Sequence, residues 1–77
     1  MDVCMVVVVF SAGRRLIFFD GRSACRLNPG VEVYNAAGKL LFYSHLEVLT
    51  VTLDGQAITT SNSAAIMQKL ARDNPPA

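Results

Sequence analysis

The chain has 77 residues, of which 52% are hydrophobic and 17% are charged, and this composition excludes a chain that is disordered throughout. Seven Lys and Arg against six Asp and Glu leave a formal net charge of +1, which excludes a strong bulk attraction to nucleic acid or to an anionic membrane. The length fits one small domain, and a chain this apolar with so little surface is expected to associate with itself. The two cysteines, Cys4 and Cys25, cannot build a disulfide framework and are expected to be buried thiols in a reduced compartment.

The N-terminal run Val3–Phe10 is strongly apolar, and five of its eight residues are valine. β-Branched residues favour a strand, and side chains alternate between the two faces of a strand. One face would carry Cys4, Val6, Val8 and Phe10, and the other Val3, Met5, Val7 and Val9. Because both faces are apolar, we expect burial on two sides, which requires either a sheet that curls into a small barrel or a second copy of the protein.

The same run lacks the pattern of a targeting signal or a membrane helix. Asp2 stands before it in place of a basic cluster, and Arg14 and Arg15 follow it. No window reaches the ~18 apolar residues of a membrane span. The chain is therefore expected to be a soluble cytoplasmic protein with no membrane partner, and this strand is expected to belong to the mature fold.

Six further strand-like runs follow, separated by turn signals rich in Gly, Asn, Asp and Pro. The predicted strands are Arg15–Phe19, Ser23–Leu27, Val31–Tyr34, Lys39–Ser44, Leu46–Leu53 and Gln56–Thr60. In the longest of them, Leu49, Val51 and Leu53 are expected to share a face, and the phase of Val48 predicts a bulge near that residue. Asp54-Gly55 is typical of a two-residue hairpin turn.

The pattern changes to that of a helix near the C-terminus. Ser61-Asn62-Ser63 offers candidate N-caps, and Pro75-Pro76 prevent continuation, so a helix is predicted at about 62–73 with a disordered tail at 74–77. Its apolar stripe consists of Ile66, Met67 and Leu70.

These elements predict a β-rich α+β fold in a single domain of residues 1–77. We expect a small antiparallel sheet or partly open barrel of about five to seven short strands, followed by one C-terminal helix that covers part of one sheet face. The residues expected in the core or in a dimer contact are Val6, Val8, Phe10, Ile66, Met67 and Leu70.

No motif in the sequence carries a recognisable catalytic or cofactor chemistry. An active site can be imagined from Cys25, Ser44, His45 and Glu47, but no nucleophile motif accompanies them. One His and two distant Cys lack the close ligand pairs of a zinc site, and the glycines are scattered singly rather than in a phosphate-binding loop. We therefore predict that the protein is not an enzyme and has no cofactor or metal.

Four arginines, Arg14, Arg15, Arg22 and Arg26, lie within 13 residues of sequence. If they gathered on one edge they could grip phosphate groups, with Tyr34, Phe42 and Tyr43 as stacking surfaces for single-stranded nucleic acid. The alternative is that the arginines keep strand ends soluble and the aromatic residues pack within the sheet.

The sequence thus favours a non-enzymatic interaction protein, a homodimer that acts as an adaptor, inhibitor or regulator by binding another protein. The alternatives are a nucleic-acid-binding regulator that uses the arginine cluster, and a structural subunit of a larger homo-oligomer. The candidate partner-binding residues are Arg14, Arg15, Arg22, Arg26, Tyr34, Tyr43 and His45.

Overall fold

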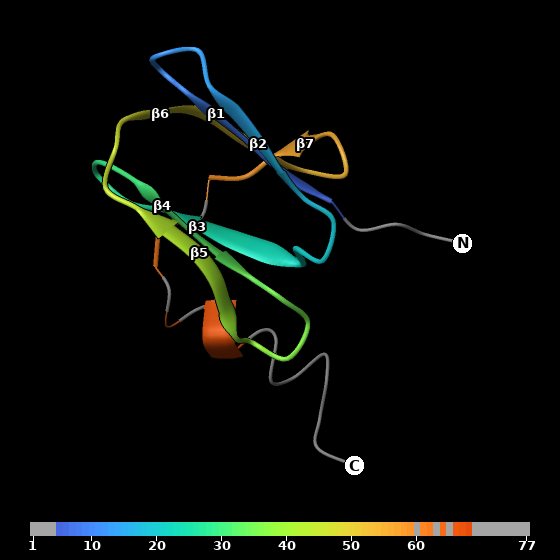
Figure 1. The fold of residues 1–77 in the computed structure, drawn as a ribbon. Coiled ribbons are helices and arrows are strands. Elements are labelled where there is room, and N and C mark those ends of the chain that lie inside the picture. Colours follow the sequence, from blue (N-terminus) through green and yellow to red (C-terminus); the bar gives the residue numbers. More distant parts are fainter. Residues whose placement is uncertain (1–4, 60, 63, 65, 69–77) are drawn as a thin grey trace.

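The computed structural model describes residues 5–59, 61, 62, 64 and 66–68. The strands are β1 (Val6–Phe10), β2 (Arg15–Phe18), β3 (Ser23–Arg26), β4 (Val31–Tyr34), β5 (Leu40–Ser44), β6 (Val48–Leu53) and β7 (Gln56–Ala57). They form a four-stranded sheet in the order β2-β1-β6-β7 and a three-stranded sheet in the order β3-β4-β5 (Figure 1). Every pairing in both sheets is antiparallel.

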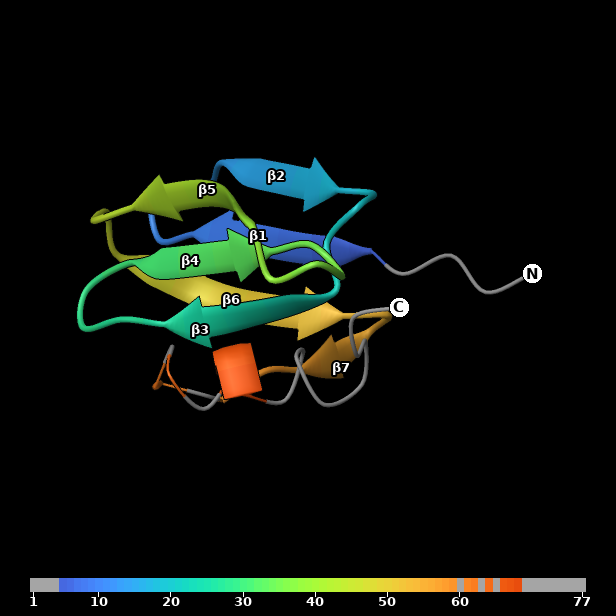
Figure 2. The same cartoon turned by 90° about the horizontal axis from the view of Figure 1, so that it is seen from below.

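The prediction of a β-rich antiparallel fold is confirmed, and the described strands form two small sheets that do not close into a barrel. The two sheets pack face to face, with the core between them (Figure 2). Two layers replace a barrel because the chain crosses from β2 to the second sheet through Asp20-Gly21 and returns to β6 after β5. Each sheet thereby covers only the inner face of the other.

β1 supplies the centre of this core. Its side chains alternate between buried and half-buried, and Val6, Val8 and Phe10 lie inside, against the buried residues of β3, β4 and β6. Val7 and Val9 point to the opposite face and are only half-buried. The expectation that both faces of β1 would be buried is therefore wrong for the outer face, because no described element of the chain covers it.

The bulge predicted near Val48 is present in β6. Val9 pairs with Thr50 and Phe10 pairs with Val48, so Leu49 between them has no partner on β1. The extra residue restores Val48 to the buried face that Val51 also occupies, and it leaves Leu49 61% exposed. The expectation that Leu49 shares the face of Val51 is therefore wrong, because the bulge changes the alternation at that position.

The hairpin turn predicted at Asp54-Gly55 is confirmed. Both residues have positive φ, 51° for Asp54 and 85° for Gly55, and Leu53 pairs with Gln56 on either side. Two residues with positive φ match the turn that best fits the twist of antiparallel strands.

The predicted C-terminal helix is described only at Ala64 and 66–68. Ile66 is buried against Cys25 and Tyr34 on the outer face of the three-stranded sheet, with Leu27 beside them. Met67, expected in the same apolar stripe, is 42% exposed. Leu70 and the predicted tail at 74–77 lie outside the described residues.

Gly30, in the turn between β3 and β4, provides a test of this packing. Its φ is 114°, and an added Cβ would overlap the carbonyl oxygen of Ser44, whereas at Gly13, with a φ of 99°, an added Cβ meets open space. We expect Gly13→Ala to lower the free energy of unfolding by about 1–2 kcal/mol through φ strain alone, and Gly30→Ala to lower it by roughly 2 kcal/mol more. Urea unfolding followed by circular dichroism measures both, and equal losses would contradict the close approach.

Candidate functional site

The outer face of the three-stranded sheet is only partly covered. Ile66 closes over Cys25 and Tyr34, which belong to β3 and β4, and the coloured helical turn in Figure 2 lies on the β3 side of this sheet. β5 has no such cover among the described residues. The uncovered strand β5 is therefore the candidate binding surface of this sheet.

Large apolar side chains are exposed along β5 and beside it. Leu40 is 46% exposed, Leu41 39% and Tyr43 55%, and Met67 of the helical turn is 42% exposed. Leu40 and Tyr43 pair with Tyr34 and Glu32 of β4, which places them on the outer face. Met67 lies next to the turn that leads into β5, because its Cε would be 3.2 Å from a Cβ added at Gly38. We call Leu40, Leu41, Tyr43 and Met67 the β5 strip.

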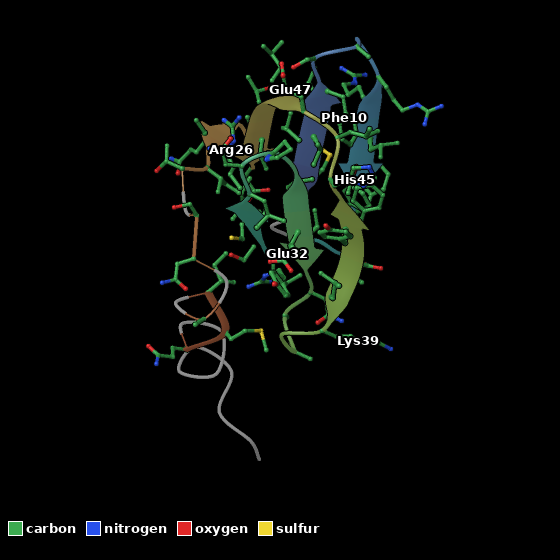
Figure 3. The ribbon with its side chains drawn as sticks, turned by 90° about the vertical axis from the view of Figure 1, so that its left-hand side faces the viewer. Phe10, Arg26, Glu32, Lys39, His45 and Glu47 are labelled. Carbon is green, nitrogen blue, oxygen red and sulfur yellow. The ribbon has the colours of Figure 1, made fainter. Side chains whose placement is uncertain are left out.

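β5 is also the last strand of its sheet, so one side of its backbone has no strand partner among the described residues. Edge strands usually carry charges or proline that prevent pairing with another chain, and β5 contains neither. Lys39 and His45 flank the strand at opposite ends, as Figure 3 shows. The register between β4 and β5 shifts between Val33 and Tyr34, so Leu41 of β5 has no partner on β4. The part of β5 with regular pairing is therefore Phe42–Ser44.

Two polar side chains of β4 on this face are hydrogen-bonded to each other. The Tyr34 hydroxyl donates a hydrogen bond of 2.9 Å to Glu32 Oε1. The buried Cys25 lies in the same cluster as Tyr34 and Ile66. Burial, and secondarily the negative charge of Glu32, raises the pKa of the Cys25 thiol, so the thiol stays protonated at neutral pH.

The four arginines are not brought together. Arg14 and Arg15 are exposed at the start of β2, and Arg22 is exposed before β3. Arg26 ends β3 and is half-buried, and its Nη2 donates a hydrogen bond of 2.9 Å to the Val48 carbonyl oxygen of the other sheet (Figure 3). The cluster seen in the sequence is therefore divided, because Arg22 and Arg26 lie at opposite ends of β3, and Arg26 joins the two sheets.

The two candidate tyrosines also differ in their exposure to solvent. Tyr34 is only 6% exposed and lies under Ile66, so its ring is not open to a stacking base, whereas Tyr43 is exposed on the β5 strip. His45 is exposed directly after β5.

The residues from which an active site was imagined are separated and hold other contacts. Ser44 Oγ accepts a hydrogen bond from the Leu46 amide at 3.1 Å. Glu47 Oε1 accepts one from Ser11 Oγ at 2.8 Å. Cys25 lies on the outer face of its sheet, whereas Ser44 pairs with the buried Val31 and lies on the inner face. This geometry does not align a nucleophile with a base.

Residues 5–59 and the described C-terminal positions contain no group of three or more His, Cys, Asp or Glu side chains that could hold a metal ion. In the same part of the chain, no helix has the length and apolar character needed to cross a membrane.

The chain matches no known family, and neither the curated proteins nor the solved structures contain a match. No residue role can therefore be carried over from a relative, and the β5 strip stands on its own geometry.

Sequence reasoning identified Tyr43 but missed Leu40 and Leu41, and it placed Met67 in a buried stripe. The adjacent Leu40 and Leu41 could have indicated this surface. In a strand with one face in water, apolar and polar residues should alternate, so two neighbouring leucines place one apolar side chain toward the solvent. What the sequence does not reveal is that this strand ends its sheet.

The hydrogen bond from Arg26 can be tested against Arg22, which flanks the other end of β3 and is exposed. We expect Arg26→Ala to lower the free energy of unfolding by about 1–2 kcal/mol, because the bond to the Val48 carbonyl is lost, and Arg22→Ala to change it by less than about 0.5 kcal/mol. Urea unfolding measures both variants. Similar values for the two would show that the contact between the sheets contributes little.

The raised pKa of Cys25 predicts an alkaline loss of stability. Above the ordinary thiol pKa of about 8.5, the unfolded chain releases a proton that the folded chain retains, so the free energy of unfolding falls as pH rises through that value. Chemical unfolding between pH 7 and roughly pH 10 should show a shallower decline for Cys4→Ala/Cys25→Ala than for Cys4→Ala, in which Cys25 is the sole thiol. Parallel declines would contradict a raised pKa.

Proposed function

We propose that this chain is a non-enzymatic interaction protein that binds another polypeptide along the β5 strip and acts as an adaptor, inhibitor or regulator. One observation carries the proposal. Four large apolar side chains, each between 39% and 55% exposed, lie on or beside an edge strand that has no charge or proline to guard it. Exposed apolar groups of this kind mark interaction sites when they gather on one surface.

The chemistry of the strip favours an extended segment with apolar side chains. Leu, Met and Tyr adapt to partners of different shape, and Tyr and Met are enriched at the centres of protein interfaces. The backbone edge of β5 at Phe42–Ser44 offers hydrogen bonds to an added strand, while Leu40 and Tyr43 offer apolar contacts for its side chains. Lys39 and Glu32, of opposite charge, lie beside the strip, so no single sign of charge is selected.

Binding of nucleic acid through the arginines remains an alternative with less support. A phosphate-binding surface needs several cations in one place, and Arg26 is already engaged with the Val48 carbonyl. Of the three aromatic residues considered for stacking, Tyr43 is the exposed one, because Tyr34 is covered by Ile66 and Phe42 is only half-buried. The third possibility, a structural subunit, predicts closed oligomers or polymers without any other partner.

The strip can be tested with a defined probe. A library of random twelve-residue peptides displayed on phage is selected against the full chain, and the selected peptides are measured by fluorescence anisotropy. Leu40→Lys should weaken them by tenfold or more, because it places a charge in the apolar contact, whereas Leu46→Lys should leave them unchanged. Leu46 is a matched control, since it is 55% exposed but lies outside the strip.

The same measurements decide against the proposal if no peptide is selected, or if both variants weaken binding equally. A single-stranded RNA oligonucleotide provides the second arm. RNA binding that weakens steeply with salt and is abolished by Arg14→Ala/Arg15→Ala, in the absence of peptide binding, would replace the proposal with the nucleic-acid alternative.

A further inference from the structure

Glu32 places a carboxylate on the outer face of the three-stranded sheet, beside the β5 strip. In the strand pairing it stands between Cys25 of β3 and Tyr43 of β5, and residues paired directly across antiparallel strands share a face. The other strand residues that the pairing places on this face are uncharged, and they are Ser23, Tyr34 and Leu40. Among the paired strand residues, Glu32 therefore supplies the charge of this face.

The Glu32 carboxylate is held in place but has no basic partner among the described residues. The Tyr34 hydroxyl donates a hydrogen bond of 2.9 Å to Oε1, and Oε2 accepts none from the part of the chain that the structure describes. Glu32 is half-buried, and an ionised group that is partly removed from water costs free energy unless a cation or further hydrogen bonds compensate it. The face thus carries an oriented negative charge that a partner can neutralise.

The ring of Tyr43 lies next to this carboxylate. Tyr43 pairs directly with Glu32, which places the two Cβ atoms about 5 Å apart. The Tyr43 side chain is 55% exposed, and the faces of an aromatic ring attract cations, as a carboxylate does. A guanidinium group suits both neighbours, because it is planar, stacks on aromatic rings and donates two parallel hydrogen bonds to a carboxylate. The ammonium group of lysine has the charge but not this planar shape.

The open edge of β5 places a bound strand within reach of both groups. A strand added to β5 lies about 4.8 Å from it and therefore roughly 10 Å from β4, which carries Glu32. The side chain opposite Tyr43 on that strand points to the same outer face. An arginine at this position and Glu32 extend toward each other from the two sides of Tyr43, whereas a short polar side chain stops beside the ring.

We propose that Glu32 determines the specificity of the β5 strip by selecting an arginine in the bound segment. The partner is then an extended apolar segment with an arginine opposite Tyr43, and this inference rests on the proposed function because it concerns the same site. The strip as a whole favours neither sign of charge, since Lys39 also lies beside it. Lys39 precedes β5, whereas Glu32 lies within β4, and Figure 3 shows the two side chains apart. The selection therefore concerns one position of the segment and not its total charge.

The test begins with the random twelve-residue library, selected in parallel against the unchanged chain, Glu32→Gln and Glu47→Gln. Glutamine keeps the shape of glutamate and can still accept the hydrogen bond of Tyr34, but it carries no charge. Glu47→Gln is a matched control, because Glu47 also accepts a hydrogen bond from a hydroxyl, that of Ser11 at 2.8 Å, and lies outside the strip. We expect arginine to be enriched over the unselected library with the unchanged chain and with Glu47→Gln, and not with Glu32→Gln.

The affinity of a selected peptide then measures the pairing directly. The arginine of the peptide is replaced by glutamine, and both peptides are titrated by fluorescence anisotropy against the same three proteins. The replacement should weaken binding to the unchanged chain and to Glu47→Gln by roughly tenfold, the effect of one hydrogen bond between charged groups. Binding to Glu32→Gln should weaken by less than about twofold, because the partner of the arginine is already absent.

Circular dichroism and urea unfolding establish that both variants fold. If Glu32→Gln fails to fold, a salt titration of the two peptides on the unchanged chain replaces it, and only binding of the arginine peptide should weaken as the ionic strength rises. An equal salt dependence would overturn the inference. Selected peptides without arginine enrichment, or an equal loss of affinity with Glu32→Gln, would also overturn it and leave the proposed function standing. If no protein selects any peptide, the proposed function is lost and this inference is lost with it.

Discussion

The contact between the two sheets is the constraint on which the rest of the structure depends. Val6 and Val8 of β1 are fully buried against Val31 and Val33 of β4. At one side of the sandwich, the ring of Phe42 lies 5.1 Å from that of Phe18, centroid to centroid, and closes the space between β2 and β5. Because this packing uses one face of each sheet, both outer faces remain to be covered by something else.

The outer faces of the two sheets differ in how far described residues cover them. On the three-stranded sheet, Ile66 of the helical turn covers Cys25 and Tyr34, whereas no described residue covers Leu40 and Tyr43 of β5. On the four-stranded sheet, no described element covers Val7 and Val9. The first surface is an edge with adaptable side chains, which suits varied polypeptide partners. The second is a broad face rich in stiff β-branched side chains.

The polar residues act mainly at the ends of the sandwich. Arg26 reaches the Val48 carbonyl across the two sheets, and Ser11 donates to the Glu47 carboxylate, which joins the β1–β2 turn to the connection before β6. In the linear sequence, Arg26 was a candidate for binding and Glu47 was a candidate for catalysis. In the fold they hold together loops that would otherwise expose backbone groups, which explains why charged residues at strand ends do not converge on a site.

The sequence by itself determined the local structure: the strands, the Asp54-Gly55 turn, the bulge near Val48 and the apolar nature of both faces of β1. These follow from side-chain alternation and turn chemistry, which act between near neighbours. Only the tertiary structure decided that the strands divide into two sheets, that β5 ends one of them, and that Arg26 bonds the other sheet. Sheet order depends on which apolar faces meet across long stretches of chain, and several orders would bury the same short runs equally well. The β5 strip is therefore a property of the fold, although each of its residues could be read in the sequence.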